Sequence, residues 1–313
     1  MSNYVIHADQ KLLATLRAYY KDALSDRLPA GALFAAKRPD VTITAYRSGK
    51  VLFQGKAAEQ EAAKWMENHT APENKPKDQN RAKTTALSEQ ELGSLSAIGS
   101  DEVGTGDYFG PIVVAAAYVD RGHLDRIAAL GVKDSKQLND ETITRIAPTI
   151  METVPYAVTV LTNAEYNRWQ QSGMPQTKMK ALLHNRTLAK LIDDIAPIEP
   201  EAIIIDQFLE RNSYFRYLED ETRIVRERVH CLPKAEGVHV AVAAASIIAR
   251  YMFLAEMDKL SRTVGLPLPK GAGAIVDEAA AQLIRQQGVG ALETCAKLHF
   301  ANTKKALDIA KHS

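Results

Sequence analysis

Cysteine is scarce in this chain of 313 residues. The two cysteines, Cys231 and Cys295, are too few for a disulfide framework and lack the spacing of a metal site. Long apolar runs are also missing, since residues 111–119 fall far short of the ~20 that a membrane helix needs. No cationic and then apolar leader opens the chain, because Asp9 interrupts it early. We therefore expect a reduced, cytoplasmic protein with no membrane partner.

An excess of charge of one sign is absent as well. Lys and Arg total 39 against 38 Asp and Glu, which gives a formal net charge of +1. This balance neither demands nor excludes a nucleic-acid partner, because local clustering matters more than the sum. The hydrophobic share of 46% and the charged share of 25% are those of an ordinary soluble globular protein. The length suits two domains.

Residues 1–70 predict a small N-terminal α+β domain. Helical spacing of apolar residues covers 9–28, strands follow at 32–36, 41–46 and 51–54, and a second helix covers 57–68. From residue 69 to 93 the composition changes to Pro, Asn, Lys, Gln, Thr and Ser without periodicity. Such a segment is typical of a linker, which we place at residues 71–94.

Residues 95–313 predict an α/β domain. Expected strands cover 96–100, 112–119, 156–161 and 202–205. Expected helices cover 123–130, 140–154, 178–195, 238–264, 277–287 and 303–312. Mixed strands followed by a helical C-terminal half indicate this fold class.

Two adjacent carboxylates, Asp101 and Glu102, precede a glycine turn formed by Gly104, Thr105 and Gly106. Crowded carboxylates repel each other unless cations hold them, and glycines let a ligand approach backbone N–H groups. The pattern predicts a divalent-metal site for a phosphorylated ligand. A dinucleotide-binding loop is excluded, because the third glycine comes one residue late and Pro111 opens a β-branched run. No P-loop sequence is present.

Two further carboxylates could join this pair. Asp206 ends an apolar strand, at the end where α/β sheets bind ligands, although a turn or N-cap aspartate has the same signature. Glu236 lies near a helix start, where it could simply favour the helix dipole. Together the four would form the oxygen-only ligand shell that Mg²⁺ prefers.

Several motifs resemble the bacterial ribonuclease HIII family over essentially the whole chain. They are Asp-Glu-Val-Gly-Thr-Gly-Asp-Tyr-Phe-Gly-Pro from Asp101, Val-Lys-Asp-Ser-Lys up to Lys136, Ile-Ile-Ile-Asp206, Lys-Ala-Glu236 and Ala-Ala-Ser246-Ile-Ile-Ala-Arg. The related ribonuclease HII family has Arg where this chain has Thr105, and usually Asp where it has Glu236. Both differences favour ribonuclease HIII.

The resemblance implies an RNase H-like catalytic domain with a helical C-terminal part, and an N-terminal domain similar to the TATA-binding-protein fold. It implies that Asp101, Glu102, Asp206 and Glu236 are both the catalytic and the metal-binding residues. Two Mg²⁺ ions roughly 4 Å apart, with Mn²⁺ as an alternative, would activate water and stabilise the leaving 3′ oxygen. No histidine is then needed as a base, so we assign no role to His184, His239 or His299.

Substrate contacts follow from the same resemblance and from local charge. It implies that Gly104, Thr105 and Gly106 meet the RNA strand in the minor groove. The loop residues Lys133, Ser135 and Lys136 either contact phosphate or form a solvated turn. In the small domain Lys50 belongs to a basic cluster that is either a solvated face or a phosphate-binding surface adding duplex affinity. The cluster consists of Lys37, Arg38, Arg47, Lys50 and Lys56, with Tyr46 and Phe53 between them.

We expect a monomeric endonuclease that cuts the RNA strand of RNA–DNA hybrids and leaves 5′-phosphate and 3′-hydroxyl ends. Two alternatives stay open: ribonuclease HII-like cleavage at single embedded ribonucleotides, and a non-catalytic hybrid-binding protein. One geometric question also stays open. Neighbouring strand residues point to opposite faces, so Asp101 and Glu102 converge only if the strand ends or distorts, which Gly99 or Gly104 would permit.

Overall fold

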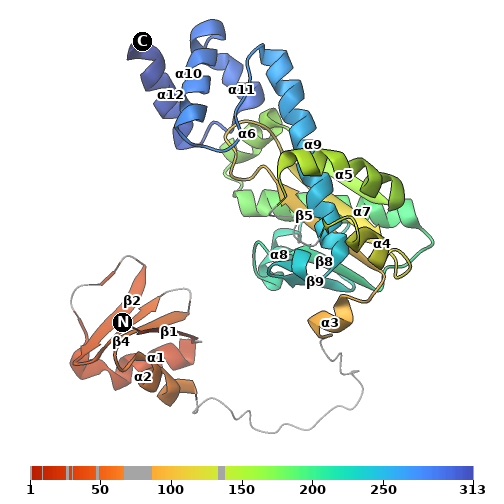
Figure 1. Cartoon of the computed structure of the whole chain (residues 1–313). Helices are drawn as coiled ribbons and strands as arrows, with labels where there is room; N and C mark the ends of the chain where they lie inside the picture. Colours follow the sequence, from red (N-terminus) through yellow and green to blue (C-terminus); the bar gives the residue numbers. More distant parts are fainter. Residues whose placement is uncertain are drawn as a thin grey trace. The chain divides into compact units, whose positions relative to one another are not determined.

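The computed structural model describes residues 2–8, 10–25, 28–29, 31–46, 49–66, 87–132 and 138–312. The chain divides into two compact units, Met1–Thr84 and Thr85–Ser313. We call them the N-terminal unit and the catalytic unit, the second after the catalytic domain that the family resemblance implies, and describe each by itself (Figure 1).

The N-terminal unit is a four-stranded antiparallel sheet in the order β1-β4-β3-β2 with two helices. Its elements are β1 (Ser2–His7), α1 (Gln10–Tyr19), the 3₁₀ turn η1 (Lys21–Ala23), β2 (Ala32–Arg38), β3 (Val41–Tyr46), β4 (Lys50–Gly55) and α2 (Ala58–Met66). Strand β1 was not predicted, because its short sequence carries little apolar alternation. Helix α1 is also shorter than the predicted 9–28, since the chain turns into η1 after Tyr20.

Strand alternation divides the predicted basic cluster between the two faces of this sheet. Phe53 is fully buried in the core with Ile43 rather than lying between surface cations, which corrects that expectation. Arg38 stacks over the rings of Tyr19 and Tyr20, at 5.3 and 5.2 Å. Lys37 alternates along its strand with core residues, so its side chain points away from the core. Lys37 pairs with Thr42, and Thr42 pairs with Gln54, so these three residues share that face. Arg47 lies outside the described residues.

The catalytic unit has a five-stranded mixed sheet in the order β7-β6-β5-β8-β9. Its strands are β5 (Ala97–Val103), β6 (Ile112–Val119), β7 (Tyr156–Leu161), β8 (Ala202–Asp206) and β9 (Val229–Leu232). Strand β5 pairs antiparallel with β6 and parallel with β8. Four of these strands were predicted, whereas β9 was missed because it spans only four residues.

The helices of this unit are more numerous than the sequence predicted, and their bounds differ from the predicted ones by a few residues. They are α3 (Glu89–Leu92), α4 (Leu124–Ala128), α5 (Asp140–Thr153), α6 (Asn163–Gln171), α7 (Gln176–Ile195), α8 (Arg211–Tyr217), α9 (Val240–Val264), α10 (Ala274–Gln287), α11 (Leu292–Cys295) and α12 (Ala301–His312), with 3₁₀ turns η4 (Ala235–Gly237) and η5 (Val289–Ala291). The predicted helices correspond to α4, α5, α7, α9, α10 and α12. The short helices α3, α6, α8 and α11 were missed.

Strand β6 shows why the sheet is covered on both faces. All eight of its residues are buried. Val113 and Ala115 pack with residues of α5 and α9, whereas Val114 packs with Met179 and Leu183 of α7. Figure 1 shows α9 and α5 running together over the sheet. Helices α9 and α7 therefore cover opposite faces of β5 and β6.

Helix α9 is the core helix of the unit. Within the described part of the chain it is the one helix long and apolar enough to cross a membrane, and 67% of its most apolar stretch is buried in the unit. Gly99 lets it approach the sheet, because a Cβ there would lie 2.1 Å from the backbone nitrogen of Val242.

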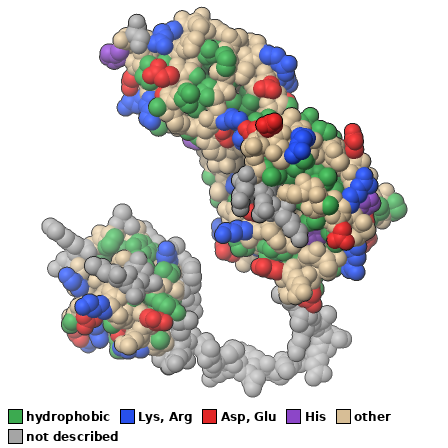
Figure 2. Space-filling view, in the orientation of Figure 1, with side chains coloured by type: hydrophobic (Ala, Val, Ile, Leu, Met, Phe, Trp, Pro, Cys, Tyr) green, Lys and Arg blue, Asp and Glu red, His purple; other side chains and the backbone are tan. Residues whose placement is uncertain are grey.

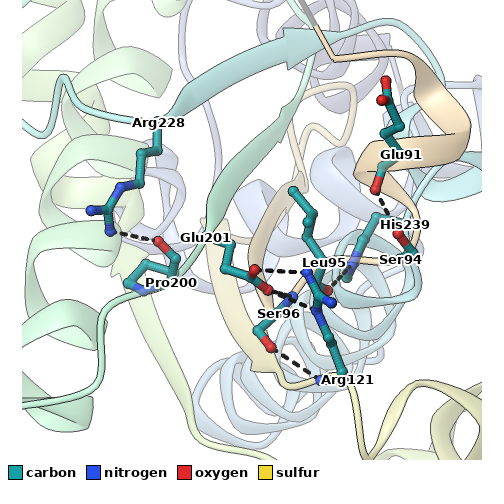
Figure 3. Close-up of polar contacts among 9 residues, drawn as sticks. All are labelled: Glu91, Ser94, Leu95, Ser96, Arg121, Pro200, Glu201, Arg228 and His239. Carbon is teal, nitrogen blue, oxygen red and sulfur yellow. Dashed lines mark hydrogen bonds and ion pairs between the residues drawn. The ribbon is translucent and has the colours of Figure 1, made fainter.

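Polar contacts tie together the sheet end that lies away from Asp101 and Asp206 (Figure 3). Glu201 accepts a hydrogen bond from the Ser96 N–H at 2.7 Å and pairs with Arg121 at 2.7 Å. The His239 Nε2 atom lies 3.0 Å from the Leu95 carbonyl. Here α3, which falls inside the interval predicted as a linker, packs its Leu92 against the catalytic unit. The packed chain therefore begins before residue 95.

Candidate metal and nucleic-acid site

Asp101 and Asp206 lie side by side because β5 and β8 run parallel. The register pairs Ser100 with Ile205, so the next residue of each strand is one of these aspartates. The Asp206 Oδ1 atom accepts a hydrogen bond of 3.0 Å from the Ala235 N–H. Both aspartates and Glu102 line a cavity of about 400 Å³. The other lining residues are Val103, Leu138, Asp140, Ile143, Ser246, Ile247 and Arg250.

The Asp101 carboxylate is buried on the α9 face of the sheet. Its strand partner is Ala115, which belongs to the core beneath α9. Burial and the negative charges of Glu102 and Asp206 raise the pKa of Asp101 to about 6, although a hydrogen bond from Ser246 opposes them. A carboxylate in this position gains from a nearby cation.

The Glu102 carboxylate points to the opposite face, toward α7. Its Oε1 atom lies 2.6 Å from the Lys180 Nζ and its Oε2 atom 2.9 Å from the His184 Nε2. Burial alone would raise the pKa of Glu102, but His184 and Lys180 outweigh it and lower that pKa to about 2. Glu102 is therefore held ionised by two basic side chains of one helix.

Strand β5 does not distort between the two carboxylates. Its ladder with β6 continues through Asp101, Glu102 and Val103 without a register shift. The neighbours consequently obey strand alternation, with one side chain against α9 and the other against α7. The Glu102 backbone N–H donates a 2.8 Å hydrogen bond to the Asp101 Oδ1 atom, although the two side chains point to different faces.

Glu236 lies beside a second cavity. The turn η4 follows Lys234, which adopts the left-handed conformation with φ of 55°, and Ala235 of this turn contacts Asp206. The Glu236 side chain lines a space of about 250 Å³ together with Gly93, Leu124 and His239. It is thus close in sequence to the Asp206 contact but is not among the residues that line the first cavity.

In the described ranges, no three His, Cys, Asp or Glu side chains converge closely enough to hold a metal ion as they stand. The donor chemistry nevertheless fits a hard cation, because Asp101 and Asp206 bring carboxylates to one cavity that Glu102 also lines. The raised pKa of Asp101, caused by burial and by both neighbours, marks the point where negative charge accumulates. Glu102 would complete the set only if one of its carboxylate oxygens were released from its contact with α7.

The glycine turn follows directly after Val103, which lines this cavity. Gly104 has φ of +95°, and a Cβ there would lie 2.2 Å from the Pro111 carbonyl oxygen. The Gln176 Nε2 donates to the Thr105 carbonyl at 3.0 Å. A Cβ at Gly106 would meet nothing within 4 Å, so this side of the turn is open to a ligand.

A buried lysine holds the segment after the turn. Lys297 is fully buried and its Nζ donates to the carbonyls of Asp107 and Gly110, at 2.8 and 2.5 Å. Burial lowers the pKa of Lys297 to about 7. These contacts anchor the turn to the C-terminal helices.

Sequence reasoning assigned no role to several side chains around the carboxylates. Lys180 and His184 are four residues apart on α7 and were predicted to be helical but not functional. Arg250 pairs with Asp140 at 2.9 Å at the edge of the cavity, and Lys270 pairs with the same carboxylate. The sequence did contain a signal for Lys180 and His184. They are two polar residues with helical spacing in a helix face that is otherwise buried.

The remaining predicted contacts lie elsewhere. Lys133, Ser135 and Lys136 fall outside the described residues. Lys50 is exposed at the start of β4, in the N-terminal unit. On the face seen in Figure 2, acidic and basic side chains of the catalytic unit are interspersed, in keeping with the net charge of +1.

Comparison with known proteins places this chain in a family. Residues 98–303 match the Ribonuclease HII family, and residues 3–78 match a Domain of unknown function (DUF3378). The Ribonuclease HIII of Geobacillus kaustophilus is 80% identical over 312 residues, with 100% of both chains covered. The chain belongs to the ribonuclease HIII family. A second ribonuclease HIII, from Geobacillus sp. strain WCH70, is 61% identical and covers 99% of this chain and 100% of its own.

Solved structures of ribonuclease HIII agree with this assignment. The crystal structure of Bst-RNase HIII in complex with Mn²⁺ matches with a TM-score of 0.72 and 77% identity, covering 100% of both chains. The RNase H3 of Aquifex aeolicus, at 21% identity and a TM-score of 0.53, shares the fold. The RNase H-like fold expected from the sequence is confirmed.

Proposed function

We propose that Asp101, Glu102, Asp206 and Glu236 are the metal-binding and catalytic residues of a ribonuclease H. As a member of the ribonuclease HIII family, the chain is a metal-dependent endonuclease that hydrolyses the RNA strand of RNA–DNA hybrids. The observation that carries the assignment is that Asp101 and Asp206 lie side by side at the C-terminal ends of adjacent parallel strands, in a cavity that Glu102 also lines. That edge of an α/β sheet is where ligands bind.

The bound ions supply an activated water and stabilise the leaving 3′ oxygen, which gives 5′-phosphate and 3′-hydroxyl ends. The residues of the chain supply charge and position. Asp101 and Asp206 present carboxylates side by side, and Glu102 is kept ionised by α7. Glu236 reaches the same edge if its side chain turns from the second cavity, and the Ala235 contact with Asp206 keeps its turn near. We propose two Mg²⁺ ions as the resident metals, with Mn²⁺ as an alternative.

RNA is recognised through the turn formed by Gly104, Thr105 and Gly106. Backbone groups on an open glycine turn suit the shallow minor groove of an A-like hybrid, where 2′-hydroxyls are displayed. The absence of contacts around a Cβ at Gly106 supports such an approach. Lys133, Ser135 and Lys136 remain predicted phosphate contacts of the same duplex.

The N-terminal unit adds affinity for the duplex. The face of its sheet away from the core carries Lys37, Thr42 and Gln54 in one row, and Lys50 begins β4, the strand that contains Gln54. Lysines on such a face contact phosphates without reading sequence. We propose that this unit has a TATA-binding-protein-like fold and that the enzyme is a cytoplasmic monomer.

Thr105 bears on the choice between hybrids and single embedded ribonucleotides. Its side chain is too short to reach along the substrate backbone, so binding depends on several consecutive 2′-hydroxyls. We expect efficient cleavage in Mg²⁺ once the RNA tract spans about four nucleotides, and poor cleavage of a single ribonucleotide.

Cleavage rates on labelled duplexes with one to eight ribonucleotides, with and without EDTA, test this function. Equal rates on the single-ribonucleotide and long-tract duplexes favour the ribonuclease HII-like alternative. Binding without any metal-dependent cleavage favours a hybrid-binding protein. The set of carboxylates argues against a protein that only binds hybrids, because a site that only binds phosphates would favour Lys and Arg.

A further inference from the structure

Helix α7 contacts the Glu102 carboxylate with two side chains that differ in exposure. Lys180 and His184 lie four residues apart, so they share one face of the helix. Each takes one carboxylate oxygen, at 2.6 and 2.9 Å. The His184 side chain is 0% exposed, whereas that of Lys180 is 12% exposed. The two contacts therefore differ in how easily they can change.

His184 is fixed on every side. Its Nδ1 atom lies 2.7 Å from the Ser100 hydroxyl, which donates to the Ala115 carbonyl at 3.0 Å. Its ring stacks on Phe208 with centroids 5.2 Å apart and an interplanar angle of 18°. Ser100 and Glu102 lie two residues apart on one face of β5, so the imidazole bridges them. Since a carboxylate only accepts, the Nε2 atom donates to Glu102.

Lys180 has a second contact besides Glu102, made in the same conformation. Its ammonium group sits on a flexible four-carbon stem, 4.1 Å from the centroid of the Phe208 ring. A cation over an aromatic face is stabilised without any carboxylate. Lys180 can thus leave Glu102 and remain over Phe208, whereas His184 cannot leave without breaking the Ser100 contact.

We propose that His184 is a positioning residue that retains Glu102, and that Lys180 is a displaceable cation competing with the catalytic metal for the Oε1 atom of Glu102. This inference rests on the proposed role of Glu102 as a metal ligand. It explains how the ligand stays paired before the metal arrives, and why the carboxylates do not converge as the side chains stand. Metal entry exchanges Lys180 for the ion while His184 keeps the other oxygen in place.

Calorimetric titration of the full-length protein with Mn²⁺, without nucleic acid, tests the exchange. Lys180→Met should tighten the Mn²⁺ dissociation constant roughly three- to tenfold, because one competing, partly buried ion pair is removed. Lys180→Arg, which keeps the charge, should not tighten it. Lys178→Met is the matched control, since Lys178 lies on the same helix and pairs with Asp220 at 3.4 Å. Unchanged or weaker binding by Lys180→Met would overturn the exchange.

His184 is tested by its opposite effect. His184→Ala should weaken Mn²⁺ binding and lower kcat while KM for the hybrid stays unchanged, and His184→Gln should restore part of both. Mn²⁺ binding unaffected by both His184 variants would overturn the positioning role. The Glu102→Gln variant distinguishes a failure of this inference from a failure of the proposed function on which it rests. If Glu102→Gln binds Mn²⁺ like the unaltered chain, the proposed ligand set fails; if it weakens binding while Lys180→Met has no effect, only the exchange fails.

Discussion

At the scale of single residues, neighbouring carboxylates experience opposite environments. Asp101 is buried and lies near negative charges, and both effects raise its pKa to about 6. Glu102 would also be raised by burial, but His184 and Lys180 lower its pKa to about 2. Strand alternation causes the difference, because it sends the two side chains to different helices. Among the described residues, Asp101 therefore has no basic partner, whereas Glu102 already has two.

Asp101→Asn should stabilise the metal-free protein in a pH-dependent way. Because the pKa of Asp101 rises from 3.8 to about 6 on folding, the folded state holds the proton more tightly, and stability falls as pH rises between these values. Asn does not titrate, so the variant gains up to about 3 kcal/mol at pH 8, and this advantage shrinks toward pH 4. Glu102 is ionised in the folded state throughout that window, and its opposite contribution to the slope fades above its unfolded pKa of 4.5 and is common to both proteins.

Urea unfolding in EDTA at several pH values measures this gain. Two tryptophans are present, one in each unit, so Trp169 reports the catalytic unit in a Trp65→Phe background. A variant that is less stable than the unaltered chain at pH 8 would show that Asp101 is not electrostatically strained.

The roles of single residues were only partly predictable. The pairing of Asp101 with Glu102 and the strand-end position of Asp206 could be seen in the sequence, because both depend on local order along the chain. The contact of Glu102 with Lys180 and His184 spans 78 and 82 residues and depends on which face of α7 meets β5. No local pattern encodes that choice. The location of Glu236 beside the second cavity escaped prediction for the same reason.

At the scale of secondary structure, the close packing of α9 on β5 places Asp101 beneath Ser246. Long periodic segments such as α5, α7 and α9 were predictable because their apolar faces repeat over several turns. Short elements such as β9 and α3 were not, since four residues carry no measurable period. The approach of α9 depends on a single missing side chain, at Gly99.

Gly99→Ala should destabilise the catalytic unit by about 3 kcal/mol or more. Its Cβ would lie 2.1 Å from Val242 N and 2.2 Å from Ala241 C, and backbone atoms cannot move aside as a flexible side chain can. Gly106→Ala is the control, because a Cβ there meets nothing within 4 Å, and we expect a change below about 0.5 kcal/mol. Thermal unfolding compares the two. Equal stability of both variants would mean that α9 does not pack on β5 as described.

At the scale of the whole molecule, the boundary of the catalytic unit matters for separating its functions. The sequence predicted a linker to residue 94, but α3 begins at Glu89 with a Ser88–Glu91 capping box, and Leu92 is 2% exposed. The change in composition marked the linker but could not show where packing resumes, because Leu92 and Leu95 contact residues far along the chain.

Deleting residues 1–84 should leave the stability of the catalytic unit unchanged. Deleting residues 1–93 should cost about 2 kcal/mol, because Leu92 and the cap of α3 are lost. Both deletions should weaken hybrid binding and make its salt dependence shallower, since phosphate contacts of the N-terminal unit disappear. Unfolding and salt-dependent binding isotherms measure these effects. If the salt dependence of hybrid binding is unaltered, Lys37 and Lys50 are solvated charges that do not contact phosphate.

The account as a whole depends on the carboxylates at the ends of β5 and β8. Its most direct test is the Mg²⁺-dependent cleavage of a labelled RNA–DNA hybrid by Asp206→Asn, measured beside hybrid binding by the same protein. We expect cleavage to fall at least about a thousandfold, as expected when a transition-state interaction is lost. Binding should persist or tighten, because repulsion of phosphate decreases. Near-normal turnover by Asp206→Asn in Mg²⁺ would contradict the assignment of this site.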